Sequence, residues 1–430
     1  MKLTCTLITI ALLLSIAPRA LAQSIILDKD EERVFQEFNW IPYGFFSESF
    51  GLGIGIGGGY TGWPKEPSSV LGAVTLGTKG SYNVALALTD YQLAVMPRVT
   101  IEPIVVSGLY QDQRIYSGSN PEFPTERAGS NGSDEDNFIE VKQWDNWARL
   151  RFLYLLPLGH GKETIVHNYI IDRGFLVRNP SGGESWNPVK SGRTHFSIAP
   201  QWRGQDLQNN KDQELPLDTY NVEIALEHDN RDFPFNPTRG SSQRIAYQKD
   251  FDDHAVYGEW EAWTIELDKL FNFSATERYR QRVLALGFWT SYVPTWEADI
   301  VDGVEVITKR PPYYEGATLG SIYRMRAYED HRWQDKAAIY YSAEYRVVPE
   351  WQPLHDYDWL DWAAIQYWQW VFFTEVGQVA PHYNVSDLHD ELRFDVGFGL
   401  RGMLHKSVCR LDIAVGEEGS RVVAMYGQPF

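Results

Sequence analysis

The chain has few cysteines, no excess of basic residues and, beyond residue 22, no long apolar run. Cys5 and Cys409 are the two cysteines among its 430 residues. We predict that Cys5 is removed with a secretion signal, so no intramolecular disulfide stabilises the fold. The formal charge of -18 excludes a nucleic-acid-binding protein, whose surface field would have the opposite sign. Because no stretch of about 20 apolar residues occurs after residue 22, a protein that crosses a membrane with helices is also excluded.

The first 22 residues have the features of a secretion signal. Lys2 precedes a mostly apolar stretch from residue 7 to residue 16, and Ala20 and Ala22 are small residues at the usual cleavage positions. We therefore expect a signal peptide over 1–22. The segment 23–46 would then be a short periplasmic or lumenal segment, in which residues 28–38 form a short amphipathic helix or a tether.

Alternation of apolar and polar residues dominates the rest of the chain. In the segment 391–401 every second residue is apolar, and the residues between them are charged or glycine. This period of two is typical of β-strands with one apolar and one polar face. Such strands suit both a soluble sandwich and a transmembrane barrel, whose polar face lines the lumen.

Three observations favour the barrel over a soluble all-β protein such as a sugar-binding sandwich. The candidate strands are about 10–15 residues long, which matches a tilted transmembrane strand rather than the soluble strand of about 5–6 residues. Trp and Tyr cluster near strand ends, as in the aromatic girdles of membrane barrels. The chain also ends on an aromatic residue, Phe430. We therefore predict an all-β fold, a 16-stranded antiparallel transmembrane β-barrel in a bacterial outer membrane.

The predicted barrel occupies residues 47–430. Its candidate strands are 47–61, 68–80, 82–94, 98–117, 138–156, 163–178, 193–206, 219–229, 240–251, 259–272, 281–295, 336–348, 365–379, 391–403, 407–416 and 421–430. Sixteen is an even number, as in single-chain bacterial barrels. If long loops and short turns alternate between the two ends, the stretch 118–137 falls on the periplasmic side and the turn at 157–162 on the outer side.

A turn between the eighth and ninth candidate strands carries the first resemblance. Its sequence, DNRDFPFNPTRG, resembles the D-x-R-D…P-x-x-G turn of the bacterial surface antigen family. This family is the BamA/TamA-type barrel of the outer-membrane assembly and two-partner-secretion superfamily. Pro237 stops strand pairing, Gly240 supplies permissive dihedral angles, and Asp229 and Asp232 accept hydrogen bonds from loop amides or from Arg231. An ordinary Pro/Gly hairpin turn is the alternative interpretation.

The second resemblance lies between the eleventh and twelfth candidate strands. The tetrapeptide MRAY, which contains Arg326 and Tyr328, resembles the V-R-G-F or L-R-G-Y tip of the family's long sixth extracellular loop. The resemblance implies that this loop folds into the lumen and that Arg326 pairs with Glu344 and Glu375 on the next two strands. Ala327 departs from the family's glycine and would cost strain if the position requires a positive φ. An exposed loop arginine among unrelated acids is the alternative interpretation.

The third resemblance is the end of the chain. The segment 423–430, with Tyr426 and Phe430, looks like the family's closing strand, which serves as the signal for barrel assembly. The three motifs cover residues 219–430, and the earlier half of the chain matches by general pattern. Family members that assemble or secrete proteins carry periplasmic repeat domains before the barrel, and residues 23–46 are too few for one.

The leading functional interpretation is a minimal assembly or translocation factor for protein or lipid. The alternatives are a passive diffusion channel or a structural surface protein, and an outer-membrane phospholipase is a minor one. No G-x-S-x-G or H-E-x-x-H motif occurs, so we expect no enzyme, no catalytic residues, no cofactor and no metal. The acidic run at 133–137 could bind a divalent cation, although a solvated loop is the stronger interpretation. Expected partners are outer-membrane lipids, the barrel-assembly machinery during biogenesis, and an unknown periplasmic or surface protein, but no nucleic acid.

Overall fold

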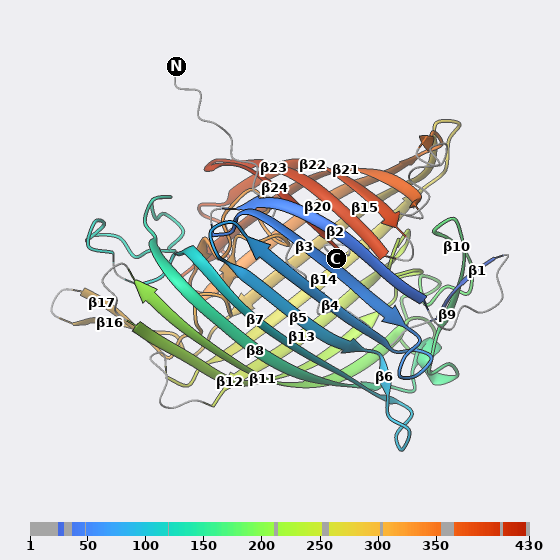
Figure 1. Cartoon of the computed structure of the whole chain (residues 1–430), viewed down its shortest axis with the longest axis horizontal. Helices are drawn as coiled ribbons and strands as arrows, with labels where there is room; N and C mark the ends of the chain where they lie inside the picture. Colours follow the sequence, from blue (N-terminus) through green and yellow to red (C-terminus); the bar gives the residue numbers. More distant parts are fainter. Residues whose placement is uncertain are drawn as a thin grey trace.

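The computed structural model describes residues 25–29, 37–47, 49–118, 120–209, 214–251, 258–301, 304–353, 365–404 and 407–426. Among these residues, sixteen antiparallel strands pair in sequence order and curl into a barrel, which Figure 1 shows on its side. They are β2 (Glu37–Ser47), β3 (Gly51–Thr61), β4 (Ser69–Gly77), β5 (Tyr82–Thr89) with its continuation β6 (Tyr91–Gln92), β7 (Val99–Ile115), β8 (Ile139–Leu155), β11 (Arg193–Asn209), β12 (Glu214–Asp229), β13 (Gly240–Asp250), β14 (Glu261–Phe273), β15 (Tyr279–Tyr292), β20 (Ala337–Pro349), β21 (Ile365–Ala380), β22 (Arg393–Leu404), β23 (Ser407–Gly416) and β24 (Gly419–Tyr426). The predicted all-β, sixteen-stranded fold is confirmed. In the described part, no helix has the length and apolarity needed to cross a membrane.

The prediction missed one barrel strand and assigned one segment to the barrel wrongly, so the predicted number of sixteen strands is still correct. The barrel begins with β2 at Glu37 rather than at residue 47, because β2 pairs along its whole length with β3. The candidate strand 163–178 is not part of the barrel. It forms β9 (Asn168–Asp172) and β10 (Phe175–Arg178), which make a separate small sheet with β1 (Ile25–Asp28). The segment 28–38, which was expected to be a helix or a tether, therefore begins at the end of β1 and ends within β2. The predicted signal peptide 1–22 lies outside the described residues.

The corrected strand order moves one loop to the opposite end of the barrel. With β2 as the first strand, the stretch 118–137 lies at the same end as the segment 293–336, contrary to the expected periplasmic placement. We call this end the loop end. The other end, which we call the insertion end, carries the segment 156–192 between β8 and β11, with the short 3-10 helix η1 (Gly159–Lys162), β9 and β10. Figure 1 shows β16 (Glu297–Val301) and β17 (Val304–Thr308) at the loop end, and β1, β9 and β10 at the insertion end.

The two faces of the sheet differ as the alternation predicted. On β22, Phe394 and Val396 face outward with 51% and 50% of their surface exposed, whereas Asp395 and Arg401 are fully buried in the barrel interior. The same division holds on β23, where Leu411 is exposed and Asp412 is buried. An apolar exterior with a charged interior is the arrangement of a transmembrane barrel rather than of a soluble sandwich.

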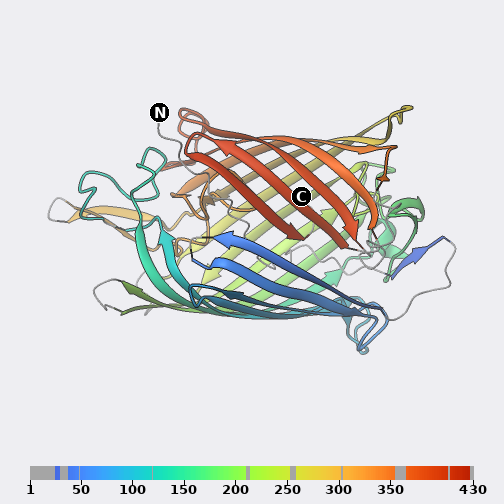
Figure 2. The same ribbon diagram turned by 45° about the horizontal axis from the view of Figure 1, so that its top comes forward.

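The sheet forms a closed barrel, and we call the boundary between its first and last strands, β2 and β24, the seam. Eleven residue pairs join β2 to β3, and eight join β23 to β24. Figure 2 shows the red C-terminal strands and the blue N-terminal strands facing each other across this seam.

Candidate functional site

The segment 293–336 folds so that its tip enters the barrel. After the β16–β17 hairpin, the two short strands β18 (Thr318–Leu319) and β19 (Trp333–Gln334) pair and bring together the ends of the tip, residues 320–332. The backbone N–H of His331 donates to the carbonyl of Gly320 over 2.7 Å and closes this excursion. Gly320 has φ +91, and a Cβ there would lie 2.3 Å from the carbonyl oxygen of Glu329. The tip is therefore a closed turn that presents Arg326 inside the barrel.

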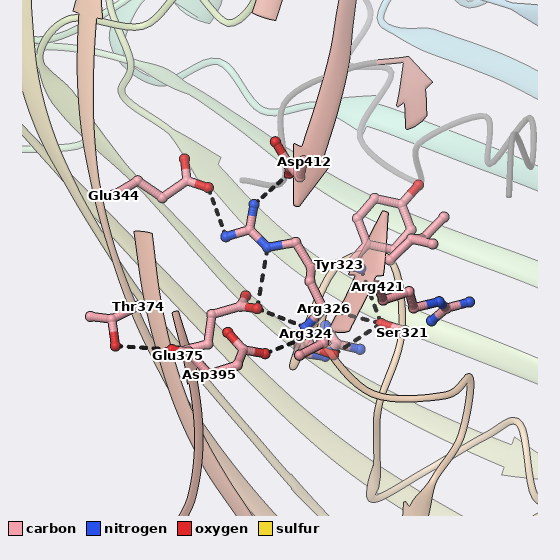
Figure 3. A network of polar contacts seen from close by, with 12 residues as sticks. Ser321, Tyr323, Arg324, Arg326, Glu344, Thr374, Glu375, Asp395, Asp412 and Arg421 are labelled. Carbon is pink, nitrogen blue, oxygen red and sulfur yellow. Dashed lines mark hydrogen bonds and ion pairs between the residues drawn. The ribbon is translucent and has the colours of Figure 1, made fainter. Parts of the chain in front are cut away.

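Arg326 is fully buried and contacts three carboxylates from three strands (Figure 3). Its Nη2 lies 3.0 Å from Glu344 on β20, its Nε lies 3.2 Å from Glu375 on β21, and its Nη1 lies 2.7 Å from Asp412 on β23. The guanidinium also stacks over the ring of Phe373, 3.5 Å from its centroid. Each nitrogen of the guanidinium thus lies near a carboxylate, and a buried charge requires such partners.

Further charges surround this contact and form what we call the ion cluster. Its members are the arginines at 326, 346, 401 and 410 and the acids Glu344, Glu375, Asp395 and Asp412. Glu344 is shared, because Arg346 and Arg401 lie 2.8 Å and 2.7 Å from its oxygens. Four arginines and four acidic residues therefore meet in the barrel interior. A buried network of this kind fixes the position of the tip, because each directional contact fails if the loop shifts.

The backbone of the tip is also held by hydrogen bonds, in addition to the contacts of the Arg326 side chain. The N–H of Arg326 donates to Glu375 over 2.7 Å, and the N–H of Ala327 donates to Asp395 over 3.1 Å. The hydroxyl of Tyr328 donates to the carbonyl of Phe394 over 2.7 Å. Ala327 does not adopt a positive φ. The left-handed residue is Met325, with φ 56, so the strain expected at Ala327 lies two positions earlier in the chain.

The structure brings the predicted loop residues together. It also shows two acidic residues in contact with the tip that the sequence analysis did not name. Arg326 reaches both Glu344 and Glu375, and Tyr328 of the same tip contacts the backbone of β22 at Phe394. Asp395 and Asp412 were not predicted as partners, although the alternation places both on the polar face of their strands. The alternation reveals which face a side chain occupies, but the stagger between strands decides which charges on that face meet.

The predicted turn motif also forms a compact unit at the insertion end. Arg231 donates from Nε and Nη2 to the two oxygens of Asp229 over 2.9 Å and 2.8 Å, and its own N–H donates to the same carboxylate. Gly240 has φ +103, and a Cβ there would lie 2.0 Å from the carbonyl oxygen of Asn230. Pro237 lies buried in the same turn. Only glycine fits position 240 without moving the backbone.

Asp232 organises this turn by accepting hydrogen bonds from its backbone. Its Oδ1 accepts from the N–H groups of Phe233 and Thr238 over 3.0 Å and 2.9 Å and from that of Arg239 over 3.3 Å, while Oδ2 accepts from the Thr238 hydroxyl. Burial raises the pKa of the Asp232 carboxyl, although these hydrogen bonds oppose the shift.

The alanine variant at Asp232 is expected to destabilise the barrel. It leaves three N–H groups without an acceptor in a largely buried turn, which costs about 2–4 kcal/mol. The measurement is the unfolding temperature on semi-native gels. Glu297→Ala, which removes an exposed carboxylate 2.9 Å from Lys309, serves as the control and should leave that temperature unchanged. Equal effects of the two variants would contradict the role of Asp232.

The insertion, residues 156–192, packs against the interior of the barrel at its end. Tyr169 and Phe233 are fully buried with ring centroids 5.0 Å apart, and Phe175 stacks on Tyr367 of β21 at 5.0 Å. A Cβ at Gly174 would lie 2.7 Å from the Tyr367 ring and 2.8 Å from the sulfur of Met403. The insertion and the turn motif therefore fill this mouth of the barrel together.

Two arginines fasten the insertion to the barrel rim. Arg98 donates to the carbonyls of Gly161 and Lys162 over 2.8 Å and 3.0 Å, and Arg193 donates to that of Ile165 over 2.6 Å. Burial lowers the pKa of the nearby His167 to about 4, so its ring is neutral at pH 7 and its Nε2–H donates to a backbone carbonyl. The insertion is held by directional contacts rather than by apolar packing alone.

Other predicted residues play no visible part in a site. In the described ranges no group of three or more His, Cys, Asp and Glu side chains is placed to hold a metal ion. In the acidic run at 133–137, the N–H of Asp134 donates to Glu126, as in an ordinary polar loop. Tyr426 ends β24, where its backbone pairs with Cys409. Phe430 lies outside the described residues.

Comparison with solved structures confirms the predicted barrel fold. CdiB from Escherichia coli is similar with a TM-score of 0.53 and 10% identity, over 88% of this chain and 58% of that chain. BamA from Haemophilus ducreyi lacking POTRA domains 1–3 has a TM-score of 0.49 and 12% identity, over 90% and 68% of the two chains. CdiB from Acinetobacter baumannii has a TM-score of 0.47 and 10% identity, and the match covers 88% of this chain and 55% of that chain.

These similarities concern the fold. No family model matches the chain, and no characterised protein matches its sequence. The chain spans between 55% and 68% of the length of the three solved structures.

Proposed function

We propose that the chain is an outer-membrane barrel that assembles or translocates protein strands or lipid through the seam between β2 and β24. The loop end would face outward and the insertion end the periplasm. The observation that carries the proposal is that the barrel interior is occupied from both ends. The tip with Arg326 enters it from one end and the insertion from the other, so a client would have to pass through the wall, and we place that passage at the boundary between the first and last strands.

The strands beside the seam have features that ease its opening. Pro42 lies within β2 and lacks a backbone N–H, which sheets tolerate mainly in edge strands. Strands β23 and β24 have 10 and 8 residues and β2 and β3 have 11, against 17 in β7, β8 and β11. A tilted strand of this shorter length spans about 25 Å or less, so the wall beside the seam barely covers the apolar band of a membrane.

The arrangement also supports the minimal character of the proposed factor. Only residues 29–36 lie between β1 and β2, so no folded repeat domain separates the small sheet from the barrel. A periplasmic partner or client would then contact the insertion, the turn motif or the short turns at that end. No catalytic role is part of the proposal.

A passive diffusion channel is the second candidate, and the filled lumen argues against it. A structural surface protein would share the fold but need no movable seam. An outer-membrane phospholipase would need a reactive serine beside a histidine, and the described hydrogen bonds contain no such pair.

Hydrogen exchange of backbone amides tests the seam directly. We expect the amides of β24 and β2 that point away from β23 and β3 to exchange about a hundredfold faster than those of β11, because the proposed opening of the seam would expose them to water. A disulfide between cysteines introduced at facing positions of β2 and β24 should slow that exchange and block passage of a client. If the seam amides are already as protected as those of β11, lateral opening is untenable.

A further inference from the structure

The outer wall of the barrel carries a group of cations and aromatic rings at the insertion end. Lys269 and Phe271 lie on the outward face of β14, and Arg282 on the outward face of β15 faces Phe273 in the register. Trp186 reaches this wall from the insertion, and the Lys269 ammonium lies 3.8 Å from the centroid of its ring. We call these five residues the Trp186 patch.

The charge of the patch is opposite to that of the chain. The protein has 57 acidic and 39 basic residues, yet neither Lys269 nor Arg282 forms an ion pair with a carboxylate in the part of the chain that the structure describes. Arg282 donates from Nε and Nη2 to the carbonyl of Ser274 over 3.1 Å and 2.6 Å. Two cations on an apolar wall are thus left without an anion of the protein's own.

A cation on a lipid-facing wall requires compensation. Lys269 lies four positions before the end of β14, among exposed apolar residues such as Leu267 and Phe271, each 44% exposed. A lysine there is stabilised when its ammonium reaches phosphate at the membrane surface, and the cost of its charge rises with depth. The ring of Trp186 covers one side of the ammonium, although the indole itself is 74% exposed. Exposed indoles of this kind favour the headgroup region.

We propose that the Trp186 patch binds the phosphate of an anionic phospholipid in the periplasmic leaflet. Lys269 and Arg282 contact the headgroup phosphate, Trp186 lies at headgroup depth, and Phe271 and Phe273 contact the acyl chains. The insertion therefore has a second role besides filling the lumen, because it holds Trp186 over the barrel rim. This inference rests on the membrane location proposed above.

The barrel supplies its own control at the other end. Lys142 on β8 lies 4.2 Å from the centroid of the Trp144 ring, which gives the same cation–π contact at the loop end. Substitution of Lys142 therefore removes an outward-facing lysine and a similar ring contact without touching the patch.

Retention of lipid by the purified barrel tests the proposal. The protein is first inserted into phosphatidylcholine vesicles and into vesicles of equal parts phosphatidylcholine and phosphatidylglycerol, then extracted and examined by native mass spectrometry. We expect retained phosphatidylglycerol, and about thirtyfold weaker retention in the Lys269→Gln/Arg282→Gln variant. Trp186→Ala, an exposed loop substitution independent of strand folding, should weaken it severalfold, and Lys142→Gln should not.

Four results would overturn the proposal. Equal retention by the wild-type protein and both patch variants removes the site, and an equal loss in Lys142→Gln shows a general charge effect. Complete displacement of the lipid by inorganic phosphate assigns the patch to a free phosphate ion. Failure of the wild-type protein to enter phosphatidylcholine vesicles would instead refute the membrane location, and with it this site.

Discussion

Replacing Arg326 with alanine is expected to lower the unfolding temperature of the barrel by about 5–10 °C, because breaking a buried ion pair costs about 3–5 kcal/mol. The loss falls unevenly on the three partners. Glu344 and Asp412 keep other arginines of the ion cluster, whereas Glu375 keeps the hydroxyl of Tyr340, the backbone N–H of residue 326 and the side chain of Asp395, none of which is a cation. The measurement is the heating temperature at which the compact band disappears on semi-native gels.

Two further variants make this expectation specific. Adding Glu375→Gln to Arg326→Ala removes the carboxylate that lost its cation, and should restore part of the stability. Lys309→Ala removes a cation from an exposed pair in the same segment, where both side chains are about half exposed, and should change the temperature by less than 1 °C. An unchanged unfolding temperature in Arg326→Ala would remove the ion cluster from the account of stability.

Opening both ends of the lumen is expected to turn the closed barrel into a steady pore. The insertion starts and ends at neighbouring points, since Leu156 donates to the carbonyl of Thr194 and His160 to that of Gly192, each over 2.9 Å. Residues 161–191 can therefore be deleted without stretching the ends of β8 and β11. The tip with Arg326 still occupies the loop end of that variant, so we expect only small, brief currents in planar bilayers.

A variant that combines both changes tests whether the insertion and the tip with Arg326 each obstruct the lumen. Deletion of 161–191 together with Arg326→Ala should give a steady current at least about tenfold larger than either change alone, because ions must pass both obstructions. Arg326→Ala alone should resemble the deletion alone. A large steady current in the unmodified protein would support the diffusion channel instead and would contradict the seam as the working route.

The strands of the C-terminal half could be predicted because their two faces differ. On β22 and β23 apolar residues alternate with charges, and the charges lie inside the barrel. On β2 the contrast is absent, since Ile41 and Tyr43 on the inner face are as apolar as Trp40 on the outer face, and Pro42 argues against a strand. The first strand was therefore missed for a physical reason, and the same proline suits its place at the seam.

The predicted strand 163–178 failed for a different reason. Tyr169 and Ile171 are buried and their neighbours are half-buried, so β9 has the period of a barrel strand. Periodicity does not reveal which sheet a strand joins, and this one pairs with β1 and β10. For the ion cluster, the resemblance gave Glu344 and Glu375. The contacts of Asp395 and Asp412 depend on how neighbouring strands are staggered, which one sequence does not specify.

The parallel pairing of β1 with β9 sets a limit on how far the seam can open. Ile25–Asp28 is held beside Asn168–Asp172, and the chain then passes through residues 30–36 into β2. Eight residues, 29–36, span at most about 28 Å when fully extended. While β1 stays docked, the first barrel strand can swing outward only within that radius. The length of this connection, rather than the strength of any bond at the seam, would then set the largest opening available to a client.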